Sequence, residues 1–281
     1  MTAAVDLASG KGARDENFPV ASFLLKPEHR APVMAFYRFA RAADDIADHP
    51  TASAEEKLRL LEAMRTGLRG GAGGAGEAAA LSEVMAARGI DPVHAFELID
   101  AFEQDVTVRR YATWADLIGY CRLSAMPVGR FVLDVHHEDR ACWPASDALC
   151  AALQVINHLQ DCGEDYRTLD RVYIPNETFV ETGSRPEDLA AAAASPALRA
   201  AIILLARRTF TLLDQSAPFA VMIRDRRLSA EVAIIQRLAT SLTHRLVQRD
   251  PLSQRVHHTA PQTALLSLSA VIAHMLRRKP T

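Results

Sequence analysis

Hydrophobic residues recur at helical spacing along almost the whole chain. In residues 28–48, for example, Val33, Phe36 and Tyr37 fall on one helical face, and Pro50 then ends the segment because proline disfavours a helical residue before it. A sustained alternation of apolar and polar residues, which would mark a strand, is not found in the sequence. The pattern predicts an all-α protein.

The predicted helices account for most of the chain. They cover residues 28–48, 55–68, 78–88, 92–109, 113–136, 146–165, 185–194, 196–217, 218–225, 230–249 and 263–278. A glycine-rich run at 70–76 is predicted to be a loop, and it lacks the Lys-Ser/Thr ending of a phosphate-binding P-loop. No linker divides the 281 residues, which lie near the upper limit for one hydrophobic core, so we predict a single domain over residues 1–281.

Composition narrows the classes of function. A formal net charge of -2, without zinc-finger spacing, argues against nucleic acid as a partner. The four cysteines form no C-x-x-C pair and are too few for a disulfide framework, which favours a reduced, cytoplasmic setting. The first residues lack the apolar segment of a signal peptide, so export is not expected.

The apolar stretch at residues 263–276 is shorter than the roughly 20 residues that a membrane-spanning helix needs. It runs into Arg277, Arg278 and Lys279. Two expectations therefore stay open for this segment: a packed terminal helix, or a helix in peripheral contact with the inner face of a membrane.

Two acidic clusters carry the strongest chemical signal. Asp44 and Asp48 form one D-x-x-x-D pattern, and Asp161 and Asp165 form another, each near the end of a predicted helix. This spacing brings two carboxylates onto one helical face, about 5–6 Å apart at Cβ, where their like charges repel unless a cation lies between them. One such pair usually marks a solvated surface, but two pairs within otherwise apolar helices indicate function.

The ligand chemistry of these clusters favours magnesium. Carboxylate oxygens without nearby cysteine or histidine suit a hard cation, and Mg²⁺ completes its shell with water and substrate phosphate oxygens. We therefore predict that Asp44, Asp48, Asp161 and Asp165 bind Mg²⁺ and that the substrate carries phosphate.

Further polar side chains continue both acidic stripes along their helices. Tyr37 and Arg41 precede the first pair at helical spacing, and Gln154 and Asn157 precede the second. The flanking positions are largely apolar, which favours a polar-lined cavity inside a helical bundle over a solvated face.

Arginines near these clusters match a phosphate-bearing substrate, because the planar guanidinium group clamps phosphate oxygens. The candidates are Arg38, Arg41, Arg122, Arg167 and Arg171, and we expect some of them to be surface residues.

Two sequence blocks resemble the squalene/phytoene synthases over nearly the whole chain. Residues 37–48 resemble the family's first aspartate-rich signature, and residues 160–166 with 171–175 resemble the second. The resemblance implies an isoprenoid-synthase helical bundle with a central cavity, Mg²⁺ as cofactor, an isoprenoid diphosphate as substrate and pyrophosphate as a product.

Within that family, residues 16–22, 120–130 and 157–161 resemble the branch that makes hydroxysqualene for hopanoid biosynthesis. The implied substrate is presqualene diphosphate, supplied by a sister isoprenoid enzyme, and the implied second reactant is water. Met126 departs from the branch pattern, where we expect asparagine, and a thioether cannot donate the hydrogen bonds of an amide.

The resemblance also implies roles for individual side chains. Tyr37 and Asn157 would take part in catalysis, with Gln154, by guiding water or pyrophosphate. The other implied substrate-binding residues are Asn17, Phe18, Phe36, Phe39, Arg38, Arg41, Arg122, Tyr166, Arg171 and Tyr173. The rings of Phe18, Phe36, Phe39 and Tyr37 would offer their faces to a carbocation.

Three alternatives stay open. A squalene, presqualene diphosphate or phytoene synthase would share both aspartate motifs, and a squalene synthase would deliver hydride from a nicotinamide cofactor instead of using water. A non-catalytic assembly factor of the same fold would have lost the acidic ligands. A purely structural bundle would not respond to magnesium and diphosphate in its stability.

Overall fold

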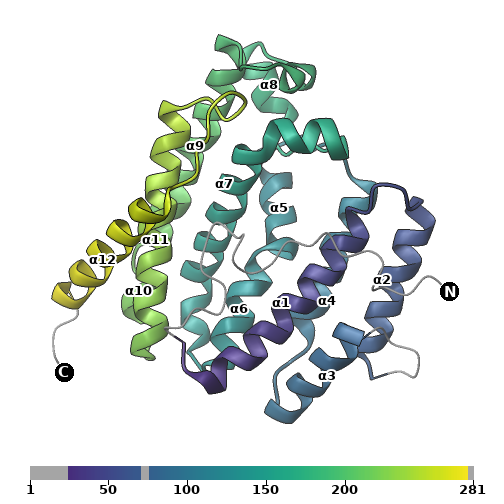
Figure 1. Cartoon of the computed structure of the whole chain (residues 1–281), viewed down its shortest axis with the longest axis vertical. Helices are drawn as coiled ribbons and strands as arrows, with labels where there is room; N and C mark the ends of the chain where they lie inside the picture. The colour runs from purple at the N-terminus through teal and green to yellow at the C-terminus, as the bar shows by residue number, and fades with distance from the viewer. Residues whose placement is uncertain (1–24, 71–75, 278–281) are drawn as a thin grey trace. The chain divides into compact units, whose positions relative to one another are not determined.

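The computed structural model describes residues 25–70 and 76–277, and these residues form helices joined by short connections (Figure 1). The helices are α1 (Pro27–Ala47), α2 (Ala54–Leu68), α3 (Gly76–Arg88), α4 (Val93–Thr107), α5 (Trp114–Ser124), α6 (Met126–Val135), α7 (Trp143–Leu169), α8 (Asn176–Thr182), α9 (Pro196–Ser216), α10 (Phe219–Met222), α11 (Arg226–Gln248) and α12 (Ala260–Arg277). The extended pairing in this part of the chain is an isolated bridge between Arg110 and Val172. The all-α prediction is confirmed.

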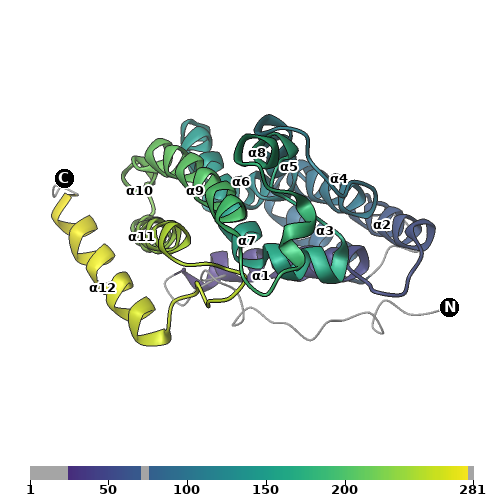
Figure 2. The same cartoon turned by 90° about the horizontal axis from the view of Figure 1, so that it is seen from above.

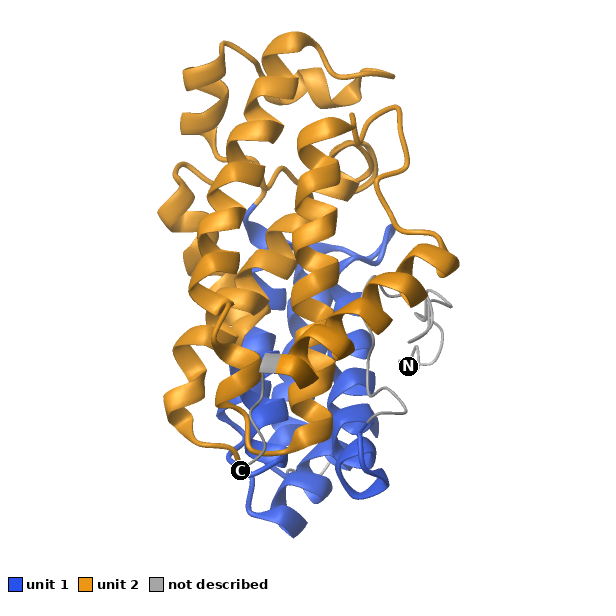
Figure 3. Cartoon of the chain, turned by 90° about the vertical axis from the view of Figure 1, so that its left-hand side faces the viewer, with its two compact units in different colours: residues 1–108, 127–137 blue, residues 109–126, 138–281 orange. Residues whose placement is uncertain are grey.

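The chain divides into two compact units (Figure 3). Unit 1 contains the chain up to residue 108 together with residues 127–137, and therefore holds α1 to α4 and most of α6. Unit 2 contains residues 109–126 and 138–281, with α5 and α7 to α12. The single-domain organisation stays a prediction.

Unit 1 is built around α1, which packs against α2, α3 and α4 (Figure 1). Phe36 and Phe39 are buried on its inner side, and the Phe36 ring stacks on Phe131 of α6 with 4.0 Å between ring centroids. On the outer side, Arg38 pairs with Glu77 of α3 at 3.3 Å. The helix is thus anchored by aromatic packing on one face and remains polar on another.

Unit 2 is built around α7, which packs against α5, α9 and α11. Its 27 residues include the buried side chains Ala152, Val155, Ile156 and Leu159 at helical spacing. At the outer edge of this unit, α12 lies alongside α11 in both views (Figures 1 and 2). Within the described ranges, we find no helix that combines the length and the hydropathy needed to cross a membrane.

Most predicted helices are present within a few residues of their expected ends, but the segment 113–136 is not one helix. It is split between α5 and α6 at Ala125, where φ is -124° and ψ is -45°. The reason is Pro127, which has no backbone N–H to donate to the preceding turn and therefore cannot continue α5, whereas it is tolerated in the first turn of α6.

Residues 185–194 were also predicted as a helix, and this is wrong beyond a short 3₁₀ turn at Pro186–Ala190. The next helix begins immediately afterwards, because the Ser195 side chain accepts a hydrogen bond from the Leu198 backbone and caps α9.

Two neighbouring predictions also need correction. The segment 218–225 shortens to α10, because the Asp225 side chain caps α11 by accepting hydrogen bonds from Arg227 and Leu228. Helix α8 was missed by the pattern because it has only 7 residues.

Burial in unit 2 leads to a stability prediction for a matched pair of leucines. Leu198→Ala, at a position with no exposed surface, is expected to lower the free energy of unfolding by about 2–5 kcal/mol. Leu265→Ala, at a leucine that is 69% exposed, should change it by less than about 0.5 kcal/mol. Urea unfolding of both variants checks this, and equal losses would contradict the packing described.

Candidate functional site

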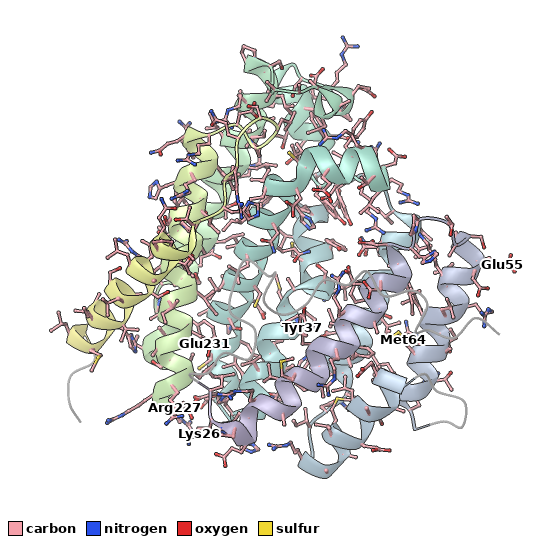
Figure 4. The ribbon with its side chains drawn as sticks, viewed as in Figure 1. Lys26, Tyr37, Glu55, Met64, Arg227 and Glu231 are labelled. Carbon is pink, nitrogen blue, oxygen red and sulfur yellow. The ribbon has the colours of Figure 1, made fainter. Side chains whose placement is uncertain are left out.

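Helix α1 presents the first predicted stripe as a continuous row of partly exposed polar side chains. Tyr37, Arg41, Asp44 and Asp48 all retain partial exposure, whereas the neighbouring Ala43 is fully buried (Figure 4 labels Tyr37). The half-buried setting follows from the helical period, which places these four residues at the border between the core and the solvated face.

Arg41 holds two of the acidic groups. Its Nη1 donates to Asp44 Oδ2 at 2.7 Å and its Nη2 donates to Asp45 Oδ1 at 3.0 Å. The guanidinium group is therefore fixed along α1 by charge-assisted hydrogen bonds. Asp45 was not among the predicted site residues, although it lies beside Asp44 in the sequence.

The carboxyl group of Asp44 is in a setting that opposes its ionisation. Burial raises its pKa to about 7, with the negative charge of Asp48 as the next cause, and Asp105 and Asp45 add to the shift. Arg41 acts in the opposite direction and lowers this pKa. A cation bound beside Asp44 would stabilise the ionised carboxylate and offset this cost.

Asp105 is a member of this acidic group that sequence reasoning missed. It is buried on α4, which packs against α1, and its charge is close enough to act on Asp44. The available signal was its position, because Asp105 is in phase with the buried Leu98 and Ala101 on α4. An acidic side chain on an otherwise apolar stripe indicates a functional or paired group.

The first acidic group fits a magnesium site that the substrate helps to complete. No cluster of three or more histidine, cysteine or acidic side chains that could hold a metal ion by itself occurs among residues 25–70 and 76–276. Mg²⁺ commonly binds through one or two carboxylates and takes its other ligands from water and phosphate. The partly exposed carboxylates of Asp44 and Asp48, whose negative charges repel each other, have this character.

Helix α7 presents the second predicted stripe in the same way. Gln154, Asn157, Asp161 and Asp165 are all partly exposed along one side of the helix. Gly163, within the acidic motif, allows close packing on another side, because a Cβ there would lie 3.4 Å from the Leu189 backbone oxygen and 3.1 Å from Arg167 Nη1. The motif therefore combines ligand-type residues with a tight contact that fixes the helix.

The end of α7 turns the chain so that the second motif continues beside the helix. Asp170 adopts a left-handed conformation with φ of 51°, and its carboxylate accepts from Arg110 Nη2 at 2.6 Å. Arg109 Nη1 donates to the Leu169 oxygen at 2.8 Å. Arg171 follows, is buried, and donates its backbone N–H to the Asp165 oxygen at 3.2 Å.

Behind the second stripe lies an aromatic cluster centred on His158. Its ring stacks on Tyr173 with 3.4 Å between centroids, and Tyr120 and Tyr111 pack around Tyr173 at 5.6 and 5.8 Å. Burial lowers the pKa of His158 to about 3, and the charge of Arg171 contributes. The histidine is therefore neutral at physiological pH.

The neutral ring orients a predicted site residue. Gln154 Nε2 lies 3.1 Å from His158 Nε2, and since the amide nitrogen can only donate, the histidine nitrogen accepts. His158 and Tyr120 were not predicted, because a histidine and a tyrosine on apolar helices usually indicate ordinary core packing.

Other candidates occupy different surroundings. Arg38, Arg122 and Arg167 are exposed, and the first of these pairs with Glu77 as described. Tyr166 lies beneath the guanidinium group of Arg110, with 5.9 Å between that group and the ring centroid. Asn17 and Phe18 lie outside the described residues. The structure thus shows Arg38, Arg122 and Arg167 as exposed residues, and Arg38 is paired with Glu77 and not with an aspartate of the first stripe.

The sequence model for squalene/phytoene synthases matches residues 12–262, which include both aspartate motifs. The chain belongs to the squalene/phytoene synthase family. A hydroxysqualene synthase from Zymomonas mobilis is 51% identical over 97% of this chain and 92% of its own length. A hydroxysqualene synthase from Rhodopseudomonas palustris is 49% identical over 99% of this chain and 95% of its own length.

Solved structures agree with this family membership. Squalene synthase HpnC from Alicyclobacillus acidocaldarius is 28% identical, with a TM-score of 0.73 over 87% of this chain and 92% of that one. A dehydrosqualene synthase shares the fold with a TM-score of 0.80 over 98% of this chain and 95% of that one, at 20% identity. The predicted family and its helical isoprenoid-synthase fold are confirmed.

The neutral state of His158 predicts an acid-dependent loss of stability. Because its folded-state pKa is about 3 and its unfolded value is near 6.5, the unfolded state binds more protons between these values, and stability falls as the pH falls. This residue alone should cost about 2 kcal/mol between pH 7 and pH 5. Urea unfolding of His158→Phe should therefore show a smaller difference between the two pH values, and an unchanged difference would contradict the assignment.

Proposed function

We propose that this chain is a hydroxysqualene synthase, which converts presqualene diphosphate and water to hydroxysqualene and pyrophosphate. The observation that carries the proposal is the near full-length similarity to hydroxysqualene synthases, at 51% and 49% identity. Both aspartate pairs predicted to bind the diphosphate are present. They argue against a non-catalytic assembly factor, which would have lost these ligands.

The acidic stripes would bind the diphosphate leaving group through Mg²⁺. Asp44 and Asp48 on α1, and Asp161 and Asp165 on α7, would supply carboxylate ligands for Mg²⁺. When bound, Mg²⁺ would neutralise the diphosphate and stabilise the charge that develops on it as the carbon–oxygen bond breaks. Arg41 and Arg171 would add positive charge, and the hydrogen bonds from Arg41 to Asp44 and Asp45 hold its guanidinium group in place before substrate binds.

The product is determined by how the carbocation is captured. In the proposed reaction the cyclopropylcarbinyl cation rearranges, water forms a new carbon–oxygen bond, and the water then loses a proton. His158 fixes the amide nitrogen of Gln154, and we propose that the amide oxygen of Gln154, together with Asn157 and Tyr37, orients this water or the departing pyrophosphate. Because His158 is neutral, it would not compete with the arginines for pyrophosphate.

The proposed location of the enzyme in the cell follows from its lipophilic substrate. We propose a cytoplasmic enzyme that receives presqualene diphosphate from a sister isoprenoid enzyme and contacts the inner face of the membrane peripherally, because the substrate is lipophilic. The runner-up within the family is a squalene, presqualene diphosphate or phytoene synthase. A squalene synthase would use a reduced nicotinamide at the step at which this chain is proposed to use water.

Product analysis tests the proposed reaction. The purified chain is incubated with Mg²⁺ and presqualene diphosphate, with and without a reduced nicotinamide, and the extracted products are identified by mass spectrometry. We expect hydroxysqualene in equal amounts in both incubations. Squalene formed only with the reductant would assign the chain to squalene synthases, and turnover of farnesyl or geranylgeranyl diphosphate alone would assign it to the other two activities.

The roles of the aspartates can be separated from a general effect of charge. Asp44→Asn and Asp161→Asn should each lower turnover by about 100-fold or more while leaving the helical circular dichroism spectrum unchanged, because an amide is a poorer ligand for Mg²⁺. Glu164→Gln, at an exposed carboxylate on the same turn of α7 as Asp161, is the matched control and should keep full activity. Full activity in either aspartate variant would remove the metal-site proposal.

A further inference from the structure

Helix α12 carries an apolar face that no described part of the chain covers. Its outward side chains are 51% to 82% exposed; they are Leu265, Leu268, Ile272, Met275 and Leu276. The first four follow each other at intervals of three, four and three residues, which keeps them on one side of the helix. Residues 260–276 contain no Asp, Glu, Lys or Arg. The exposed face is thus a continuous uncharged stripe.

The opposite face of α12 holds the helix on unit 2. Ala270 and His274 are buried, and His274 Nε2 lies 2.8 Å from the Ser229 hydroxyl group of α11. The same hydroxyl group donates to the Ala220 oxygen of α10. This polar network ties α12 to two neighbouring helices and fixes which side of α12 faces outward.

Positive charge is concentrated in this part of the sequence. Residues 219–281 contain ten arginines and lysines but three acidic residues, although the whole chain has a formal net charge of -2. Arg226 and Arg227 are exposed at the start of α11, and Figure 4 shows Arg227 at this end of the helix. The Ser229–His274 contact places the end of α12 beside this start.

Further apolar side chains lie at the same end of unit 2. Val221 and Met222 of α10 are exposed apolar side chains next to the Ala220–Ser229 hydrogen bond. Apolar and basic groups thus adjoin each other at the junction of α10, α11 and α12.

We propose that the outward face of α12, with the basic start of α11, docks this chain on a bilayer that contains anionic lipids. A helix with one uncharged apolar face lies in the plane of the membrane interface with that face towards the acyl chains, and nearby arginines are attracted to anionic headgroups. This inference rests on the proposed peripheral membrane contact and adds to it the surface and the lipid chemistry. A second copy of the chain could cover the apolar stripe, but it would not account for the excess of positive charge.

Vesicle co-sedimentation of the full chain tests the proposal. Phosphatidylcholine vesicles are compared with vesicles that also contain phosphatidylglycerol, and we expect strong binding only to the latter. The double variant Leu268→Gln/Ile272→Gln should lower vesicle affinity about tenfold or more, because it removes apolar area that the bilayer would bury on binding. Arg226→Gln/Arg227→Gln should lower it about tenfold and reduce its dependence on salt.

The matched control is Val180→Gln on α8, an apolar side chain that is 83% exposed away from α12 and should leave binding unchanged. Circular dichroism melting of each variant verifies folding. Equal binding to both vesicle types, or unaltered binding by both double variants, would overturn the proposal. A dimer in sedimentation equilibrium that Leu268→Gln/Ile272→Gln dissociates, without vesicle binding, would assign the face to self-association instead.

The reaction is measured separately with detergent-dispersed presqualene diphosphate. If vesicle binding is absent but turnover is normal, only the docking surface is wrong. If vesicle binding occurs without turnover, the docking surface stands and the proposed reaction is wrong.

Discussion

The repulsion between enclosed carboxylates is the interaction on which the candidate site depends. Asp44 is partly buried and lies near the charges of Asp48 and Asp105, so that its pKa rises to about 7. Arg41 offsets part of this cost through two short hydrogen bonds. A stable fold has no need of such an arrangement, since apolar residues in these positions would pack without the electrostatic cost. We propose that a cation and a diphosphate bind there, which would offset the electrostatic cost.

The polar groups of unit 2 are stabilised in a different way. Around His158 the structure uses stacking and a neutral hydrogen bond in place of charge pairing, and burial keeps the ring unprotonated. This keeps Arg171 as a buried positive charge beside the second acidic motif and fixes Gln154 without adding a further charge. The two units thus differ in chemistry: unit 1 has a group of mutually repelling carboxylates around Asp44 on α1, and unit 2 has an acidic motif on α7 beside a neutral aromatic cluster.

The sequence predicted the features that depend on local periodicity. The stripe on α1 could be predicted because Tyr37, Arg41 and Asp44 share a helical face regardless of what packs against it. Periodicity marks Asp105 as an acidic residue on an apolar stripe, but it could not assign the neighbours of Asp105 or Tyr120, because these are contacts with side chains distant in the sequence. The prediction of one continuous helix over residues 113–136 was wrong. The apolar spacing continues through Pro127, but the proline lacks the backbone N–H that would continue the helix.

The central claim is that these carboxylates bind Mg²⁺ together with a diphosphate, and titration calorimetry tests it most directly. Mg²⁺ is titrated into the protein in the presence of pyrophosphate, for the unaltered chain and for Asp44→Asn. The account predicts saturable binding to the unaltered chain, at least about tenfold weaker in the variant. Identical binding to both proteins, or no binding to the unaltered chain, would contradict it.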